Sequence, residues 1–143
     1  MKLKNIIYVV LMMTFSSCSL NSDSNTPQVV RNEWHLRNVS GGLEGVNNDL
    51  GFNTVIWIFN ESSSSLKVEN NNTNASIEDG LDSGTYSYSL DEDGNNIFLT
   101  IDDYEMGSLT ISTNQLIINQ NLTSNGTAAD GFIYTFRLVE IIE

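Results

Sequence analysis

The stretch GTYSYSLDEDGNNIFLTIDDYEMGSLTISTNQLIINQ, residues 84–120, decides the fold class. Apolar and polar residues alternate along it, as Tyr86, Tyr88 and Leu90 do with Thr and Ser at its start. Alternation with a period of two is typical of β-strands that bury one face. The segments DEDGNN, DDYE and STNQ interrupt the apolar runs with Gly, Asn and Asp, which tolerate the backbone angles of tight turns. The stretch therefore predicts four antiparallel strands joined by short connections.

The same alternation continues on both sides of this stretch. It recurs upstream in EWHLRNV (33–39), NTVIWIFN (53–60) and SLKVE (65–69), and downstream in GFIYTFRLVEI (131–141). No segment has a convincing helical period, so no amphipathic helix is available to cover the sheet. The eight strands can bury their apolar faces without a helix if the sheet closes on itself. The sequence predicts an all-β fold, an eight-stranded antiparallel up-and-down barrel over 32–143, with a two-sheet β-sandwich as the alternative.

Four segments carry a resemblance to a known family. NEWHLRNVSGG (32–42), VIWIFN (55–60), GTYSYSL (84–90) and ADGFIYTFRLV (129–139), in this order, resemble the lipocalin-like domains of secreted lipoproteins of Gram-negative bacteria. The resemblance implies a small calyx-shaped, lipocalin-like barrel, with Trp34 near its closed base and the long loop after the first strand near its open mouth. One departure from the pattern is Asn32, which stands where lipocalins carry Gly.

The N-terminus has the organisation of a secretory signal. Lys2 and Lys4 precede ten apolar residues (6–15), too few for a transmembrane helix, which needs roughly 20. The sequence Phe15-Ser16-Ser17-Cys18 that follows resembles the bacterial lipobox, in which the Cys receives lipid after cleavage before it. We therefore expect residues 1–17 to be a lipoprotein signal peptide and residues 18–31 to be a polar tether.

Lipid on Cys18 would also determine the cellular location of the protein. A free thiol in an ordinary signal peptide is the alternative, but secreted domains seldom keep one unpaired Cys. Two or three acyl chains would hold the protein stably on a membrane. Ser19 stands where an Asp would retain some bacterial lipoproteins in the inner membrane. The expected location is thus the cell envelope, with the outer membrane favoured.

Composition and residue types argue against several functions. The chain carries a net charge of −12, and only four basic residues against 18 acidic ones remain after residue 17, so nucleic acid is not an expected partner. The single Cys is assigned to lipid, and the single His, His35, is expected on the outer face, opposite Trp34. Without a nucleophile beside a base, or clustered metal ligands, we expect no enzyme, no metal and no cofactor. Asp91, Asp93 and their neighbours partly resemble a calcium loop, but a hairpin turn explains them better.

Aromatic residues give the first functional hypothesis. Six of them are predicted to share the inward face of the barrel: Trp34, Tyr86, Tyr88, Phe132, Tyr134 and Phe136. Buried tyrosine hydroxyls need hydrogen-bond partners, which a bound molecule can supply in a cavity. These residues are therefore candidates to line a site for a small apolar or amphipathic ligand. A lumen filled by side chains is the alternative.

A second hypothesis comes from the strand at 55–60, which is apolar on both faces. Trp57 and Phe59 are assigned to its outer face, where exposed aromatics often mark an interface. They are candidates for a surface that binds an envelope protein partner. The protein would then be an interaction or structural lipoprotein, a class that includes hydrolase inhibitors.

Overall fold

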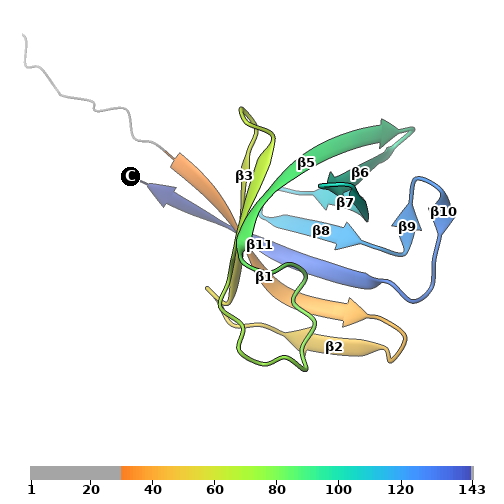
Figure 1. Ribbon diagram of the computed structural model, residues 1–143, viewed down its shortest axis with the longest axis horizontal. Helices are drawn as coiled ribbons and strands as arrows, with labels where there is room; N and C mark the ends of the chain where they lie inside the picture. Colours follow the sequence, from red (N-terminus) through yellow and green to blue (C-terminus); the bar gives the residue numbers. More distant parts are fainter. Residues whose placement is uncertain (1–29, 143) are drawn as a thin grey trace, which may run out of the picture.

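The computed structural model describes residues 30–142 (Figure 1). The predicted signal peptide and Cys18 lie outside the described residues, and the first strand begins at Val30, just before the predicted end of the tether. The described part of the chain forms strands and no helix. The strands are β1 (Val30–Gly41), β2 (Val46–Asp49), β3 (Val55–Asn60), β4 (Ser65–Asn70), β5 (Gly84–Asp93), β6 (Asn96–Ile101), β7 (Tyr104–Ile111), β8 (Gln115–Asn119), β9 (Leu122–Thr123), β10 (Gly126–Thr127) and β11 (Phe132–Ile142).

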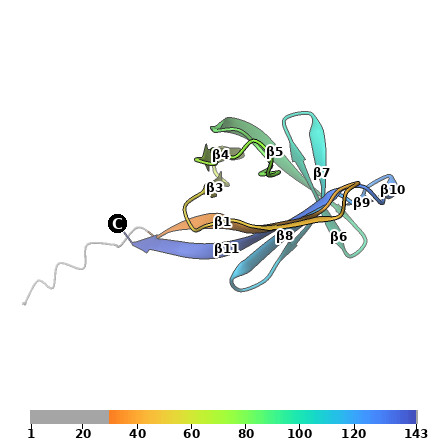
Figure 2. The same ribbon diagram turned by 90° about the horizontal axis from the view of Figure 1, so that it is seen from below.

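Eight of these strands form a closed antiparallel barrel. The order around it is β1-β3-β4-β5-β6-β7-β8-β11, and β11 returns to pair with β1, where Trp34 lies opposite Leu138. Figure 2 shows β1 and β11 side by side along their length. The predicted eight-stranded up-and-down barrel is confirmed. The sandwich is excluded, because the first and last strands are hydrogen-bonded and leave one continuous sheet.

Two of the long connections contain short strands that the sequence did not predict. β2 folds back on the second half of β1, with Val46 opposite Gly41, and β9 and β10 form a small hairpin before β11. Their sequences, VNND, LT and GT, are too short and polar to show an apolar alternation. Both are additions to the barrel, and neither interrupts its strand order.

Side chains fill the middle of the barrel. The inward face of each contributing strand supplies every second residue, as expected from the pleat. The largest fully buried side chains are Trp57, Phe136, Leu36, Leu66, Leu99, Leu116, Ile118, Val39, Val55 and Val68. Burying each large apolar side chain stabilises the fold by about 1.5–3 kcal/mol. The lumen therefore serves as the hydrophobic core, as in the filled-lumen alternative.

The connection between β4 and β5, residues 71–83, packs over one end of this core. The Tyr134 hydroxyl donates a hydrogen bond to Glu78 Oε1 at 2.9 Å, and the Gly80 N–H donates to the same oxygen at 3.1 Å. Gly80 has a φ of +89°, and a Cβ there would come within 3.5 Å of the Tyr134 ring and 3.7 Å of Trp57. These contacts close the end of the barrel that lies beyond Tyr134.

His35 is buried, and the prediction that it faces solvent is wrong. It does lie on the outer face of β1, but only 3% of it is exposed because the segment before β3 covers it. The Asn53 N–H approaches His35 Nδ1 at 3.4 Å, and the Phe52 ring packs on the imidazole with centroids 5.9 Å apart. His35 Nε2 lies 3.2 Å from Glu33 Oε2, whose other oxygen binds Arg31. The histidine is thus part of a buried polar network with structural partners.

Candidate binding cavity

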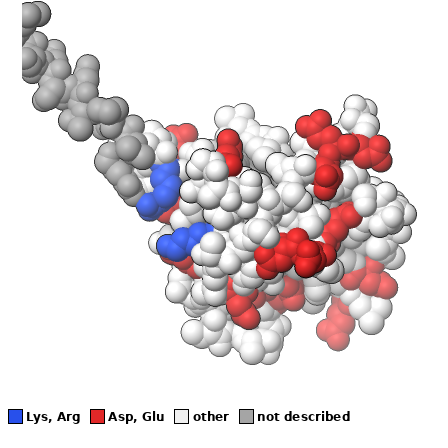
Figure 3. All heavy atoms as spheres, turned by 45° about the horizontal axis from the view of Figure 1, so that its top comes forward, with Lys and Arg blue, Asp and Glu red and all other residues white. Residues whose placement is uncertain are grey.

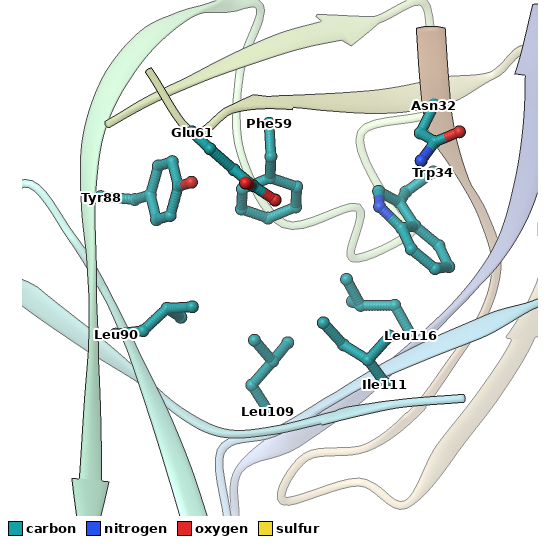
Figure 4. Close-up of a pocket in the computed structure, with 9 residues that line it drawn as sticks. All are labelled: Asn32, Trp34, Phe59, Glu61, Tyr88, Leu90, Leu109, Ile111 and Leu116. Atoms are coloured by element: carbon teal, nitrogen blue, oxygen red, sulfur yellow. The ribbon is translucent and has the colours of Figure 1, made fainter. Parts of the chain in front are cut away.

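A cavity of about 270 Å³ lies at the end of the barrel where β1 enters and where β3, β5 and β7 end. It is lined by Asn32, Trp34, Phe59, Glu61, Tyr88, Leu90, Leu109, Ile111 and Leu116 (Figure 4). Its volume equals that of roughly nine water molecules at about 30 Å³ each. Room for an occupant therefore exists at one end of the filled barrel.

The lipocalin resemblance implied a closed base near Trp34 and an open mouth near the loop after the first strand, and the cavity beside Trp34 differs from the first of these expectations. Trp34 borders the cavity, whereas residues 71–83 pack over the opposite end. A second hollow, of about 400 Å³, lies at that opposite end between the loop after β1 and residues 75–78, so hollows lie at both ends of the barrel.

Aromatic rings connect the cavity wall to the core. Figure 4 shows Trp34, Phe59 and Tyr88 on one side of the cavity and leucine and isoleucine side chains on the other. The Phe59 and Tyr88 rings meet edge-to-face with centroids 5.0 Å apart, and Phe59 contacts Trp57 at 6.2 Å. Trp57 in turn packs on Phe136 at 4.9 Å. Such pairs add about 0.5–1.5 kcal/mol each beyond the area they bury. The wall is thus continuous with the buried core of the barrel.

Glu61 is the only charged residue among those that line the cavity. It lies in the turn between β3 and β4, where the Ser64 N–H donates to the Glu61 carbonyl at 3.4 Å and Ser64 takes a φ of +48°. Figure 4 shows its carboxylate directed into the space beside Phe59 and Tyr88. Within residues 30–142, no hydrogen bond or ion pair engages this carboxylate. The cavity therefore contains one negative charge that the described protein does not neutralise.

The Tyr88 hydroxyl is the second polar group in this part of the cavity. Burial and, to a lesser degree, the negative charge of Glu61 raise the pKa of Tyr88 above its ordinary value. Tyr88 therefore stays neutral under physiological conditions and keeps a proton that it can donate. In Figure 4 its hydroxyl points toward the open space between the labelled side chains.

The rim of the cavity is apolar and exposed. Large hydrophobic residues with exposed side chains in the described chain include Val30, Leu90, Ile111 and Ile142, and all four lie at this end. Val30 pairs with Ile142 at the tip of β1 and β11, where these strands extend beyond their other neighbours (Figure 2). Concentrated exposed apolar residues are typical of a binding surface. The remaining exposed ones, Leu43, Phe52 and Tyr104, lie elsewhere.

The six aromatic residues predicted to share one site are distributed over the barrel. Trp34 and Tyr88 line the cavity, whereas Tyr134 and Phe136 belong to the core. Tyr86 is half-buried and donates its hydroxyl proton to the Asp82 carbonyl at 2.9 Å. Phe132 lies at the other end, where its ring occupies the space that a side chain at position 42 would need. The alternation identified the inward face correctly but did not show how far along the barrel each residue lies.

The assignment of Trp57 and Phe59 to an outer partner surface is wrong. Trp57 is fully buried, and Phe59 is half-buried at the cavity wall. The register explains this, because Trp57 pairs with Trp34 across β1 and β3, and paired residues share a face. The outer positions of β3 are Ile56 and Ile58. A strand that is apolar at every position gives no alternation from which its inner face could be read.

Sequence reasoning missed the other half of the cavity. Leu109 and Ile111 alternate in the segment SLTIS, and Leu116 is the second residue of the next strand. The inward position of these residues could be predicted, but not that they meet at one cavity. Glu61 belongs to a polar turn, FNESSSS, which carries no signal of the direction in which one side chain points.

The surface around the barrel is strongly acidic. Figure 3 shows acidic side chains over much of one face and the few basic ones gathered at one side. Within residues 30–142, no three His, Cys, Asp or Glu side chains come together to hold a metal ion. The same residues contain no helix long and apolar enough to cross a membrane. Asp91 and Asp93 end β5 at a hairpin, where Gly94 has a φ of +61°, so the turn interpretation of this acidic segment is confirmed.

Comparison with known proteins gives one informative similarity. The chain is 37% identical over 67 residues to a type 3 secretion system pilotin of Shigella flexneri, over 47% of this chain and 41% of that protein. The chain thus spans about two fifths of the length of this relative. No family model matches the chain, and no solved structure does. The similarity agrees with a lipid-anchored location in the cell envelope. The barrel agrees with the lipocalin resemblance of the sequence, but no comparison supports that family.

Proposed function

We propose that the protein is a non-catalytic lipoprotein of the outer membrane whose barrel binds a segment of another envelope protein. The apolar cavity and its exposed rim at the Trp34 end carry this proposal. Two further observations support it: the lipobox-like sequence before Cys18 and the partial likeness to a pilotin, a component of a secretion system.

The position of the cavity suits this role. It opens at the end where the chain enters β1, and the tether from Cys18 to Val30 spans at most about 40 Å when fully extended. A lipid on Cys18 would keep the cavity close to the membrane, where other anchored proteins present their segments. Restricting two partners to one surface raises their effective concentration, so a small apolar contact can suffice.

A photo-crosslinking amino acid at Leu90 tests the proposal in living cells. Leu90 lies on the rim, and Thr85 on the outer wall of the same strand is the matched control. We expect one discrete adduct with an envelope protein from position 90 and none from position 85. Equal adducts from both positions, or none from position 90, would exclude the cavity as the binding surface.

A small apolar or amphipathic molecule is the second candidate occupant. The largely apolar lining supports this candidate, and the cavity volume of about 270 Å³, just below the usual range of roughly 300–1,000 Å³ for small-molecule pockets, limits it to a ligand of modest size. Native mass spectrometry of the Cys18→Ala chain, after exposure to a membrane extract, would detect a retained ligand as added mass. The same mass retained by Trp34→Ala would show that it binds outside the cavity.

A further inference from the structure

The charge of Glu61 sets a condition on whatever fills the cavity. Its carboxylate projects into an otherwise uncharged space, and no described residue donates a hydrogen bond to it. In the empty protein, water solvates this group, since Glu61 is exposed. An occupant that covers the opening removes that water. Burying a charge without a partner is strongly unfavourable, so an uncharged apolar occupant would bind weakly.

A cation on the occupant would remove this penalty. The carboxylate lies beside the Phe59 and Tyr88 rings, which meet edge-to-face. A positive group bound to Glu61 would therefore also lie near aromatic faces, and cation–π attraction would add to the ion pair. The acidic surface of the protein favours approach of cations in general. The same charges disfavour an anionic head group at this position.

The dimensions of the cavity favour side chains of a polypeptide. A space of about 270 Å³ holds one or two large side chains, and the apolar rim extends the contact to neighbouring residues of a chain. We propose that Glu61 selects the occupant: the cavity receives a protein segment with apolar side chains beside a Lys or Arg, whose cation binds the Glu61 carboxylate. This inference rests on the proposed function and specifies the chemistry of the partner segment.

Capped peptides of sequence Leu-Phe-Lys-Leu, Leu-Phe-Gln-Leu and Leu-Phe-Glu-Leu test this selection. They would be titrated against the full chain, purified from membranes and reconstituted in phosphatidylcholine vesicles. The two tryptophans of the protein report binding, because Trp34 borders the cavity while Trp57 is fully buried. The Trp34→Phe variant identifies the signal that comes from the cavity. Glu61→Gln removes the charge, and Glu44→Gln, in the exposed turn between β1 and β2, removes one at the other end.

We expect the Lys peptide to bind about five-fold more tightly than the Gln peptide, and the Glu peptide to bind most weakly. The preference for Lys should persist in Glu44→Gln, disappear in Glu61→Gln and weaken as salt is raised. Equal binding of the three peptides, or a Lys preference that survives Glu61→Gln, would overturn the selection by Glu61 but leave the cavity as a peptide site. If no peptide changes Trp34 fluorescence, the proposed function fails together with this inference.

Discussion

Trp34 and Trp57 lie directly opposite each other on β1 and β3, yet only Trp34 borders the cavity. Trp57 is fully buried among the rings of Phe59 and Phe136, while Trp34 is half-buried at the open end. One cross-strand pair thus marks the boundary between the filled core and the binding space. The two residues should therefore respond differently to the same substitution.

Replacing Trp57 by Ala should destabilise the fold by about 3–5 kcal/mol, because it removes a large fully buried side chain and leaves a cavity. Trp34→Ala should lower the free energy of unfolding clearly less, because the Trp34 side chain is already partly exposed to solvent. Urea unfolding followed by circular dichroism would measure both. A similar loss for the two variants would mean that Trp34 also belongs to the core.

Tyr134→Phe should lower the free energy of unfolding by about 1–3 kcal/mol at neutral pH, because it removes the hydrogen bond that the hydroxyl donates to the partly buried Glu78 carboxylate. Burial, followed by the charge and hydrogen bond of Glu78, raises the pKa of Tyr134 above its ordinary value of 10.0. The contribution of this hydroxyl to stability is therefore complete below pH 10. Above pH 10 the unfolded chain loses the proton while the folded chain keeps it, so this stabilisation falls as the pH rises.

Urea unfolding of both proteins from pH 7 to 11 would measure this difference. Above pH 10, the difference in the free energy of unfolding between the parent chain and Tyr134→Phe should shrink, by at most about 1.4 kcal/mol per pH unit. Because the other tyrosines titrate in both proteins, their effects cancel in the comparison. A difference that stays constant to pH 11 would contradict a raised pKa.

Much of the architecture follows from the sequence, and the exceptions have identifiable physical causes. The eight barrel strands could be predicted because each has at least one apolar face, and closure followed from the lack of helices to cover these faces. The inner face of β3 could not be predicted, because Val55 to Phe59 are all apolar. Only the pairing of Trp57 with Trp34 shows which of these side chains point into the barrel. His35 escaped prediction because its burial depends on Phe52, which the chain brings back across β1.

The candidate site was only partly accessible from sequence. Trp34 and Tyr88 were predicted to point inward and do line the cavity. The position of the cavity could not be predicted, because it depends on where the core ends and which connection covers the barrel. Glu61 depends on the turn conformation around Ser64, which has a positive φ although it is not glycine. No periodic signal encodes such a turn.

Gly107→Ala should strongly destabilise the barrel, by about 2 kcal/mol or more. Gly107 has a φ of +113°, and a Cβ there would collide with the backbone of Asn119, which cannot move without breaking strand pairing. Gly94→Ala is the control, because its φ of +61° is also positive but no atom lies within 4 Å of the added carbon. It should cost only about 1–2 kcal/mol. Thermal melting would separate the two effects, and equal losses would mean that backbone angle alone matters.

Cys18→Ala should release the protein from the membrane. The motivation is the sequence Phe15-Ser16-Ser17-Cys18, which resembles a lipobox and contains the only Cys of the chain. Cell fractionation followed by immunoblotting should move the variant to the soluble fraction, and intact-mass analysis should show lipid only on the parent protein. The barrel fold should persist in the variant, because Cys18 lies before the first described strand.

Ser19→Asp is the companion variant that tests the choice of membrane. It keeps Cys18 available for lipid but introduces the Asp that retains some bacterial lipoproteins in the inner membrane. In a Gram-negative host that uses this signal, density-gradient separation should place the parent chain with the outer membrane and Ser19→Asp with the inner one. A parent chain found in the inner membrane would contradict the predicted location. Membrane association that survives Cys18→Ala would instead point to an uncleaved N-terminal segment as the anchor.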